Sequence, residues 1–169
     1  VFPKTETENV EVGPVEVVKC DEEQGGCGLV QLRQSFQPEQ MYTHDYGYRS
    51  GLNASMMKHL AHRAREAQGL AQPQAGDLVL DIGSNDSTSL RNYPETLELI
   101  GMDPTGFKFG KYYPSHIRLI PDFFSADRFT QELPGKKAKI ITSIAMFYDL
   151  ESPLGFMQDI HRILADDGI

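Results

Sequence analysis

The stretch Leu78-Val79-Leu80-Asp81-Ile82-Gly83-Ser84-Asn85-Asp86 decides the fold. Its first five residues are apolar except for Asp81, which predicts a strand covered on both faces of a sheet. Gly83 and the small polar residues after it predict a turn into a short helix. A strand that ends in an acidic residue and runs into glycine is typical of doubly wound sheets, where nucleotide-like cofactors meet the carboxyl edge.

The sequence around this stretch alternates between strand and helix patterns. We expect further strands at 97–102, 117–119 and 139–143, with helices at 126–133 and 153–165. This order predicts an α/β fold in which a parallel sheet of at least four strands is covered on both faces. Upstream, residues 53–69 predict a helix with Asn53 as N-cap, a Met56, Met57 and Leu60 core face, and Gly69 as its stop.

The first part of the chain has a different pattern. Extended runs at 10–20 and 29–32, separated by a turn at 21–26, predict a small β-rich unit with little core of its own. We therefore expect three segments: this unit at 1–45, a linking segment and helix at 46–70, and a partial cofactor-binding domain at 71–169. The last six residues have the pattern of a helix end, a turn and the start of a strand, which predicts a piece of a longer protein.

Composition excludes several classes of protein. The 169 residues include 16 Lys plus Arg and 24 Asp plus Glu, a net charge of −8. An acidic chain is a poor binder of nucleic-acid phosphates. No apolar run reaches the roughly 20 residues that cross a bilayer, and residues 1–9 lack a signal-peptide pattern. We expect a soluble, cytoplasmic protein without nucleic-acid or membrane partners, and its two cysteines fit a reducing compartment.

A second acidic residue supports a cofactor site. Asp103 follows the expected strand 97–102, about twenty residues after the first turn, where a carboxylate accepts bonds from both hydroxyls of a ribose. A nicotinamide cofactor would favour three glycines spaced G-x-G-x-x-G. Only Gly83 is present in this turn, so an NAD-dependent oxidoreductase is a weaker alternative.

Five ordered motifs, between about Cys20 and Ile169, resemble the S-adenosylmethionine-dependent C-methyltransferases of nucleotide-linked keto-sugars. They are Tyr46-Gly47-Tyr48-Arg49-Ser50-Gly51, Asp81-Ile82-Gly83-Ser84-Asn85-Asp86, Gly101-Met102-Asp103-Pro104-Thr105-Gly106, Pro121-Asp122-Phe123-Phe124-Ser125 and Ser143-Ile144-Ala145-Met146-Phe147-Tyr148-Asp149-Leu150. The resemblance implies a zinc-binding N-terminal unit, a Rossmann-like class I methyltransferase sheet and a C-terminal domain. It implies S-adenosylmethionine as cofactor and a nucleotide-linked sugar as small-molecule substrate.

The resemblance also assigns roles to individual residues. Asp103, with Pro104 beside it, would hold the ribose hydroxyls, and Asp122 and Phe123 would meet the adenine, whose amine suits a carboxylate and whose face suits an aromatic ring. The remaining cofactor-binding residues would lie at the methionine end, the ribose and the sulfonium: Asp81, Gly83, Ser84, Asn85, Asp86, Ser143 and Ala145. Ser87 departs from the glycine that the family has, which costs of order 1 kcal/mol if the backbone there is left-handed.

The cysteines have the place of a family zinc site. Cys20 and Cys27 correspond to the second of two pairs, whereas a structural zinc takes four ligands. Either they contribute to a zinc site, with His44 or the acidic residues after Cys20 as improvised ligands, or they are two free thiols.

Tyr46 and Tyr48 are the candidate catalytic residues. Methylation next to a ketone needs a donor for the developing enolate oxygen, and a tyrosine phenol suits that role. His59 and His62 lie on one helix and fit a solvated face better than catalysis. The resemblance implies that the general base belongs to a Glu-His segment that would lie beyond Ile169. We therefore expect no turnover by this chain alone. A non-catalytic or degenerate cofactor-binding module is the alternative that Ser87 and the cysteine spacing favour.

Overall fold

The computed structural model describes residues 5–7, 12–35, 37–42 and 46–169. The chain divides into two compact units, Val1–Tyr46 and Gly47–Ile169. The second unit contains the stretch that decides the fold.

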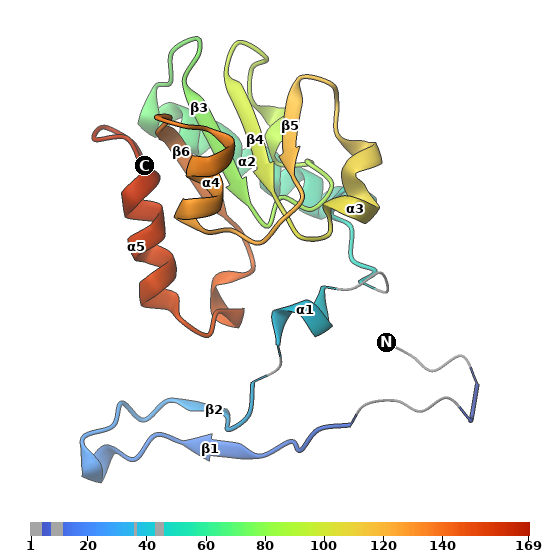
Figure 1. The fold of residues 1–169 in the computed structure, drawn as a ribbon, viewed down its shortest axis with the longest axis vertical. Helices are drawn as coiled ribbons and strands as arrows, with labels where there is room; N and C mark the ends of the chain where they lie inside the picture. Colours follow the sequence, from blue (N-terminus) through green and yellow to red (C-terminus); the bar gives the residue numbers. More distant parts are fainter. Residues whose placement is uncertain (1–4, 8–11, 36, 43–45) are drawn as a thin grey trace. The chain divides into compact units, whose positions relative to one another are not determined.

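Within residues 47–169, four parallel strands form one sheet in the order β5-β4-β3-β6 (Figure 1). The strands are β3 (Leu78–Ile82), β4 (Glu98–Met102), β5 (Ile117–Ile120) and β6 (Ala138–Ser143). The predicted α/β class and parallel sheet are confirmed, and each strand begins and ends within one residue of its predicted bounds. All five residues of β3 are buried, because the strand lies in the middle of the sheet with helices on both faces.

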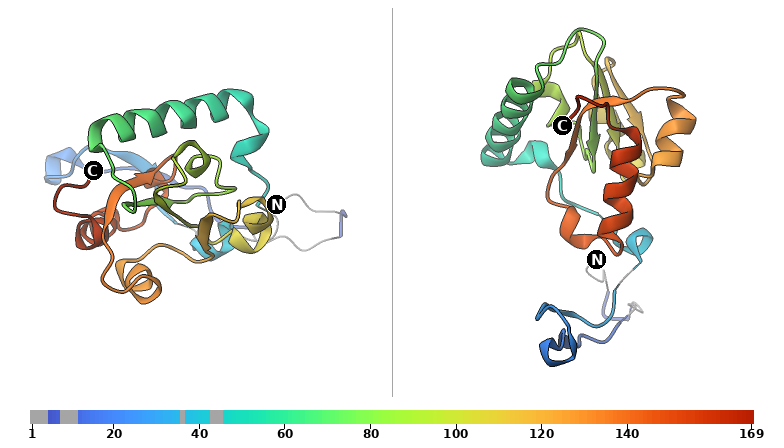
Figure 2. Two further views of the ribbon diagram at one scale, coloured as in Figure 1. Left: turned by 90° about the horizontal axis from the view of Figure 1, so that it is seen from above. Right: turned by 90° about the vertical axis from the view of Figure 1, so that its left-hand side faces the viewer.

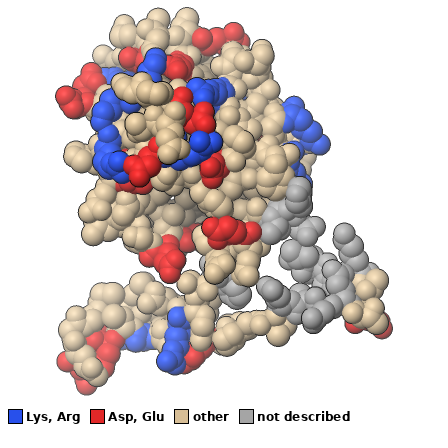
Figure 3. Space-filling view, viewed as in Figure 1, with Lys and Arg blue, Asp and Glu red and all other residues tan. Residues whose placement is uncertain are grey.

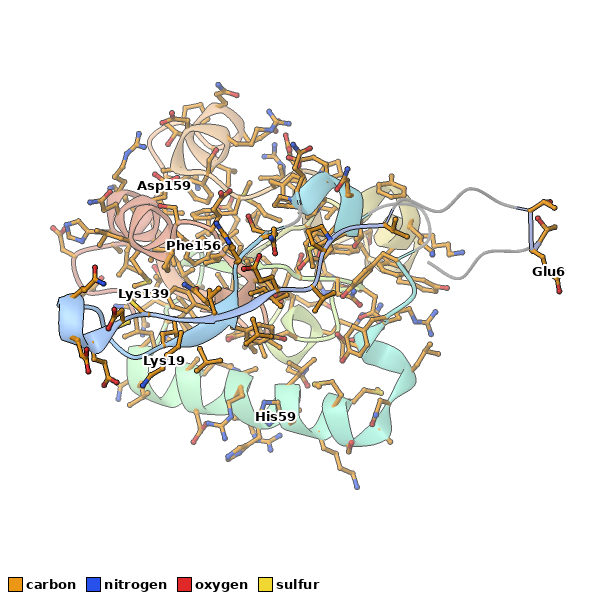
Figure 4. All side chains as sticks on the ribbon, turned by 90° about the horizontal axis from the view of Figure 1, so that it is seen from below. Glu6, Lys19, His59, Lys139, Phe156 and Asp159 are labelled. Carbon is orange, nitrogen blue, oxygen red and sulfur yellow. The ribbon has the colours of Figure 1, made fainter. Side chains whose placement is uncertain are left out.

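Helices cover the two faces of the sheet, as Figure 2 shows: α2 (Ala54–Ala71) lies on one face, and α4 (Ala126–Glu132) and α5 (Pro153–Ile163) on the other. Successive residues of a strand point to opposite faces. Val79 therefore packs with Ala64 of α2, whereas Leu80 packs with Phe129 of α4 and Ile163 of α5. Asp159 of α5 also accepts a hydrogen bond from the backbone N of Ala126 at 3.0 Å, joining the two helices (Figure 4).

Helix α2 begins where the sequence predicts, but it does not end there. Asn53 is the N-cap, and its Oδ1 accepts from the backbone N of Ser55 at 2.9 Å. Gly69 does not stop the helix, which continues to Ala71 and ends with Gln72 at φ 45°. The two residues beyond Gly69 bring Ala71 into the core, which offsets the cost of about 1 kcal/mol for a helical glycine. Met57 is also not a core residue, since its side chain is 46% exposed.

The connections that follow the strands contain short helical segments. Between β3 and β4 the chain forms a single 3₁₀ turn, η3 (Leu90–Asn92). Between β4 and β5 it forms α3 (Gly106–Phe109) and η4 (Gly110–Tyr112), and η5 (Phe147–Asp149) follows β6. Parallel strands bring their carboxyl ends to one edge, so the turns after β3, β4, β5 and β6 meet there.

The first unit is an antiparallel pair of strands, β1 (Val17–Lys19) and β2 (Val30–Leu32). The 3₁₀ turn η1 (Glu22–Gln24) lies between them, and α1 (Pro38–Met41) follows. In its described part the expected strand at 10–20 is paired only over β1, and residues 10 and 11 lie outside the described residues. Neither strand buries a residue.

A further helical turn, η2 (Ser50–Leu52), leads into α2. Among the described residues no helix is both long and apolar enough to span a bilayer.

Candidate functional site

The turn after β3 is built from alternating left-handed residues. Gly83, Asn85 and Ser87 have φ values of 71°, 52° and 64°. The backbone N of Gly83 donates to the carbonyl of Met102 at 2.8 Å, and the backbone N of Ser87 donates to the carbonyl of Ser84 at 2.9 Å. Glycine adopts this conformation freely and asparagine tolerates it, whereas serine is strained. Ser87, which stands where the resembled family has glycine, therefore has a left-handed backbone.

Residues 48–51, which we call the strap, are bound to this turn by the side chains of Asn85 and Asp86. Asn85 Oδ1 accepts from the backbone N of Ser50 at 3.0 Å, and Asn85 Nδ2 donates to the carbonyl of Tyr48 at 3.1 Å. Asp86 Oδ2 accepts from the backbone N of Gly51 at 3.1 Å. A Cβ on Gly51 would lie 2.6 Å from that carboxylate oxygen, so the approach requires glycine.

Asp103 links the turn after β3 to the turn after β4. Its Oδ2 accepts from the backbone N of Asn85 at 2.8 Å, and its Oδ1 accepts from the backbone N of Thr105 at 2.6 Å and from the Thr105 hydroxyl. The residue is 6% exposed. A carboxylate has about four lone-pair sites, so these contacts leave Oδ2 able to accept one more hydrogen bond. Pro104, the neighbour of Asp103, is half-buried in the same turn.

Asp81 is a buried carboxyl group at the centre of the edge. Thr142 of β6 donates its hydroxyl to Asp81 Oδ1 at 2.6 Å. Burial raises the pKa of Asp81 to about 7; the Thr142 hydrogen bond acts in the opposite direction, and the charge of Asp103 adds to the rise. Beside Thr142, the Ser143 Oγ is buried and has no hydrogen-bond partner among the described residues. A buried hydroxyl without a partner is costly, and a polar ligand atom at this edge would satisfy it.

Two small residues bring the turns after β3 and β6 close together. A Cβ on Gly83 would lie 3.2 Å from the sulfur of Met146, which is closer than most such contacts. Ala145, next to Met146, is left-handed at φ 59°. The loop after β6 therefore approaches the backbone of Gly83 directly.

Ser84 points toward the turn after η4 rather than into open space. Its Oγ lies 2.7 Å from the hydroxyl of Tyr113, and burial raises the pKa of that phenol. A Cβ on Gly101 would lie 2.5 Å from Ser84 Oγ and 2.8 Å from Tyr113 Oη. Gly101 therefore makes room for this hydrogen-bonded pair, in which the side chain of Ser84 is already engaged.

Asp122 and Phe123 follow β5 at the same edge. Asp122 Oδ1 accepts from the backbone N of Phe123 at 2.8 Å, and its Oδ2 lies 3.0 Å from Arg128 Nε. The Asp122 side chain is 48% exposed, so it remains open to a donor. Phe124 instead packs in the core, with its ring centroid 5.3 Å from that of Phe156 (Figure 4).

The structure does not bring all the candidate residues together. Tyr48 belongs to the strap, with its side chain 47% exposed. Tyr46 belongs to the first unit, where its ring centroid lies 5.3 Å from that of Tyr42. Cys20 and Cys27 are free thiols of the first unit, and no group of three metal-ligating side chains converges among the described residues. His44 lies outside the described residues. His59, labelled in Figure 4, is exposed on α2. His62 is exposed on the same helix.

The sequence reasoning missed three residues at this edge: Arg49, Thr142 and Tyr113. Arg49 and Thr142 contact carboxylates. Arg49 lies within the first of the five motifs, which gave it no role, and Thr142 directly precedes the motif that begins at Ser143. In the folded sheet Asp81 is paired with Thr142, and residues paired at the carboxyl end of neighbouring strands are within reach of each other. This register is not visible in the sequence, which predicts only the strand at 139–143.

Comparison with solved structures identifies the fold. No protein-family model and no curated sequence matches the chain. Among solved structures it is similar to the plantazolicin methyltransferase BpumL, in complex with a pentazolic desmethylPZN analog and SAH, with a TM-score of 0.51 and 15% identity over 65% of this chain and 42% of that one. It is also similar to a complex from Haloferax volcanii of the Trm112 methyltransferase activator and a protein designated a methyltransferase, with a TM-score of 0.52 and 21% identity over 70% and 54%.

The fold is that of the class I methyltransferases. The chain spans about half the length of these structures. At such low identity the similarity establishes the fold alone. One fold can host several activities, so the fold does not establish the activity.

Proposed function

We propose that residues 47–169 bind S-adenosylmethionine at the carboxyl edge of the sheet and form the cofactor-binding part of a methyltransferase. The observation that carries the proposal is the 2.8 Å hydrogen bond from the backbone N of Asn85 to Asp103 Oδ2. It joins the left-handed turn after β3 to a buried carboxylate after β4, in a fold shared with a methyltransferase that was solved with SAH.

The residues at the edge fit the chemistry of this cofactor. Asp103 Oδ2 has a lone-pair site for a ribose hydroxyl, and Asp122 is exposed enough to accept from the adenine amine. The unpartnered Ser143 Oγ would bind a polar group of the cofactor or substrate. Asn85 and Asp86 act through the strap, since their side chains already hold it, and the backbone of the turn is left to approach the ligand.

The substrate class that we propose is a nucleotide-linked keto-sugar, methylated at carbon. The motifs that resemble the sugar C-methyltransferases support it, and so does the position of Tyr48, whose carbonyl is bound to the turn by Asn85. When bound, S-adenosylmethionine supplies the methyl group. The Tyr48 phenol would donate a hydrogen bond to the sugar oxygen on which negative charge develops.

Calorimetric titration with S-adenosylhomocysteine and with NAD tests the cofactor. We expect S-adenosylhomocysteine to bind and NAD not to bind. Asp103→Asn should weaken binding of S-adenosylhomocysteine at least about tenfold, because hydrogen bonds to a charged acceptor contribute about 1.5–3 kcal/mol each. Asp127→Asn removes the same charge from a carboxylate that is 74% exposed on α4, and should leave the dissociation constant unchanged. Binding of NAD in preference, or no binding of either ligand, would overturn the cofactor proposal.

The substrate class is tested on the chain saturated with S-adenosylhomocysteine. A nucleoside-diphosphate keto-sugar should bind, and Tyr48→Phe should weaken it by about two- to tenfold, the effect of one neutral hydrogen bond. The same variant should bind S-adenosylhomocysteine as the natural chain does. Failure of the sugar to bind would refute this substrate class and leave the cofactor proposal standing.

A further inference from the structure

A hollow of about 180 Å³ lies behind the turn, on the α2 side of the sheet. Its walls come from the strap, α2, η3, η4 and the turn after β3, where Asp86 and Thr88 line it, and not from the strand ends that carry Asp81 and Asp122. The residues that line it include Arg49, Met57, Thr88, Arg91, Asn92 and Tyr112. This distinguishes the hollow from the edge at which we place the cofactor.

Arg91 is fixed in the wall of this hollow without a neutralising carboxylate. Its Nε donates to Ser87 Oγ at 3.2 Å, and its Nη2 donates to the carbonyls of Asp86, at 3.2 Å, and Tyr112. Among the residues that the structure describes, no carboxylate oxygen lies within 4.0 Å of Arg91. Three hydrogen bonds therefore hold the guanidinium in place, and none of them is to a carboxylate.

Three arginines, one each on β5, α4 and α5, differ in this respect. Arg118, Arg128 and Arg162 each lie within 3.1 Å of a carboxylate oxygen. Figure 3 shows blue and red side chains next to one another over α4 and α5. Paired surface charges of this kind offer little to an anion, so Arg91 stands apart from them.

Arg49 supplies a second cation to the same hollow. Its guanidinium carbon lies 4.1 Å from the centroid of the Tyr112 ring, which stacks the group and limits its motion. Its Nε lies 3.3 Å from Asp86 Oδ2. Asp86 is the one acidic residue that lines the hollow in the described chain, and it accepts from Gly51 and Thr88 as well. Two guanidinium groups against one carboxylate leave one net positive charge.

We propose that this hollow binds a phosphate group, either as inorganic phosphate or as the phosphate of a small ester. Guanidinium groups present N–H donors in a fork that matches phosphate oxygens, and the volume is below the roughly 300–1,000 Å³ of pockets for larger ligands. The anion would bridge Arg49 of the strap and Arg91 of η3. Because both contact Asp86, phosphate binding would stabilise the strap on the turn.

The decisive variants change Met57, which lines the hollow from α2. Met57→Glu puts a carboxylate at the hollow, and Met57→Gln is its neutral match of the same size. Phosphate binding is measured by phosphorus NMR titration and by the rise in melting temperature. We expect Met57→Glu to weaken phosphate binding at least about tenfold, because the carboxylate would repel the anion. Met57→Gln should stay close to the natural chain. Equal affinity in the two variants would overturn the proposal.

A second pair of variants removes the cation itself. Arg91→Met should abolish the phosphate-induced rise in melting temperature, whereas Arg65→Met, which removes an exposed arginine of α2, should retain it. If Arg91→Met does not fold, the Met57 pair still decides the matter.

Titrations with different ligands identify the source of the phosphate and separate this site from the cofactor site. Tighter binding of a hexose phosphate than of inorganic phosphate would assign an ester, and equal binding would assign the free ion. Acetate binding as tightly as phosphate would overturn the phosphate assignment. Displacement of phosphate by S-adenosylhomocysteine would overturn a separate site, whereas absence of S-adenosylhomocysteine binding with intact phosphate binding would refute the proposed function alone.

Discussion

Replacing Asp81 by asparagine should make the protein more stable at high pH than at low pH, relative to the natural chain. Burial raises the pKa of Asp81 to about 7 in the folded state, against about 3.9 for an unfolded aspartate. The folded state thus binds a proton more tightly than the unfolded state. The stability that the protonated Asp81 carboxyl group contributes is fully present below about pH 4. It is lost as the pH rises through 7, where the group ionises in the folded protein. Asparagine keeps an oxygen that accepts from Thr142 and carries no charge.

The size of the effect follows from these two pKa values. At 1.36 kcal/mol per pKa unit, the full penalty for ionising Asp81 in the folded protein is about 4 kcal/mol. Part of it is already present at pH 5, where an unfolded aspartate is mostly ionised, and nearly all of it is present at pH 8. Between pH 5 and pH 8, the free energy of unfolding of Asp81→Asn should therefore rise by about 2–3 kcal/mol relative to the natural chain.

Urea unfolding of both proteins at pH 5, 6, 7 and 8 measures this difference. Thr142→Val is the informative companion, because the Thr142 hydrogen bond lowers the pKa of Asp81. In Thr142→Val the pKa of Asp81 should be higher than in the natural chain. The free energy of unfolding of this variant should therefore keep falling to a higher pH. A difference between Asp81→Asn and the natural chain that does not change with pH would show that Asp81 ionises as an exposed carboxylate does, and would refute the reasoning.

Three further substitutions test the fold and the turn by thermal or urea unfolding. Ser87→Gly relieves a left-handed residue at φ 64° and should stabilise the protein by up to about 1 kcal/mol; a loss would mean that the Ser87 hydrogen bond with Arg91 outweighs the strain. Phe129→Ala removes a fully buried ring from the core under α4 and should cost about 3–5 kcal/mol, and a cost below about 1 kcal/mol would contradict the packing described. Asn53→Ala removes the cap of α2 and should cost about 1 kcal/mol, with Asn53→Asp as the control that keeps the cap.

The sequence was informative where local patterns and packing agree. The start of α2 follows from the preference of asparagine for the N-cap, and β3 follows from an apolar run bounded by a turn. The end of α2 does not follow from Gly69, because burial of Ala71 in the core overrides a local signal. Met57 has the spacing of a core residue, but lines a hollow at the surface.

The local role of the motif residues was harder to predict than their location. Asn85 and Asp86 lie at the expected edge, yet their side chains bond to residues 35 positions earlier in the chain. Periodicity and turn chemistry act over a few residues. The contacts with the strap instead depend on how α2, which joins the strap to β3, packs on the sheet. Only the folded chain shows that these two side chains are structural partners of the strap.

This division of roles determines what recognises a ligand at the edge. A carboxylate or amide already holding backbone groups has fewer lone pairs and donors for a ligand, and this is the position of Asn85, Asp86 and Ser84. Under the proposed function, ligand recognition therefore depends on the backbone of the left-handed turn, on Asp103 with one lone-pair site, and on the hydroxyl of Ser143, which has no partner among the described residues. Ser87 therefore bears on function through backbone geometry. A shift of its left-handed conformation would move the backbone between Asp86 and Arg91, and with it both the edge and the hollow behind the turn.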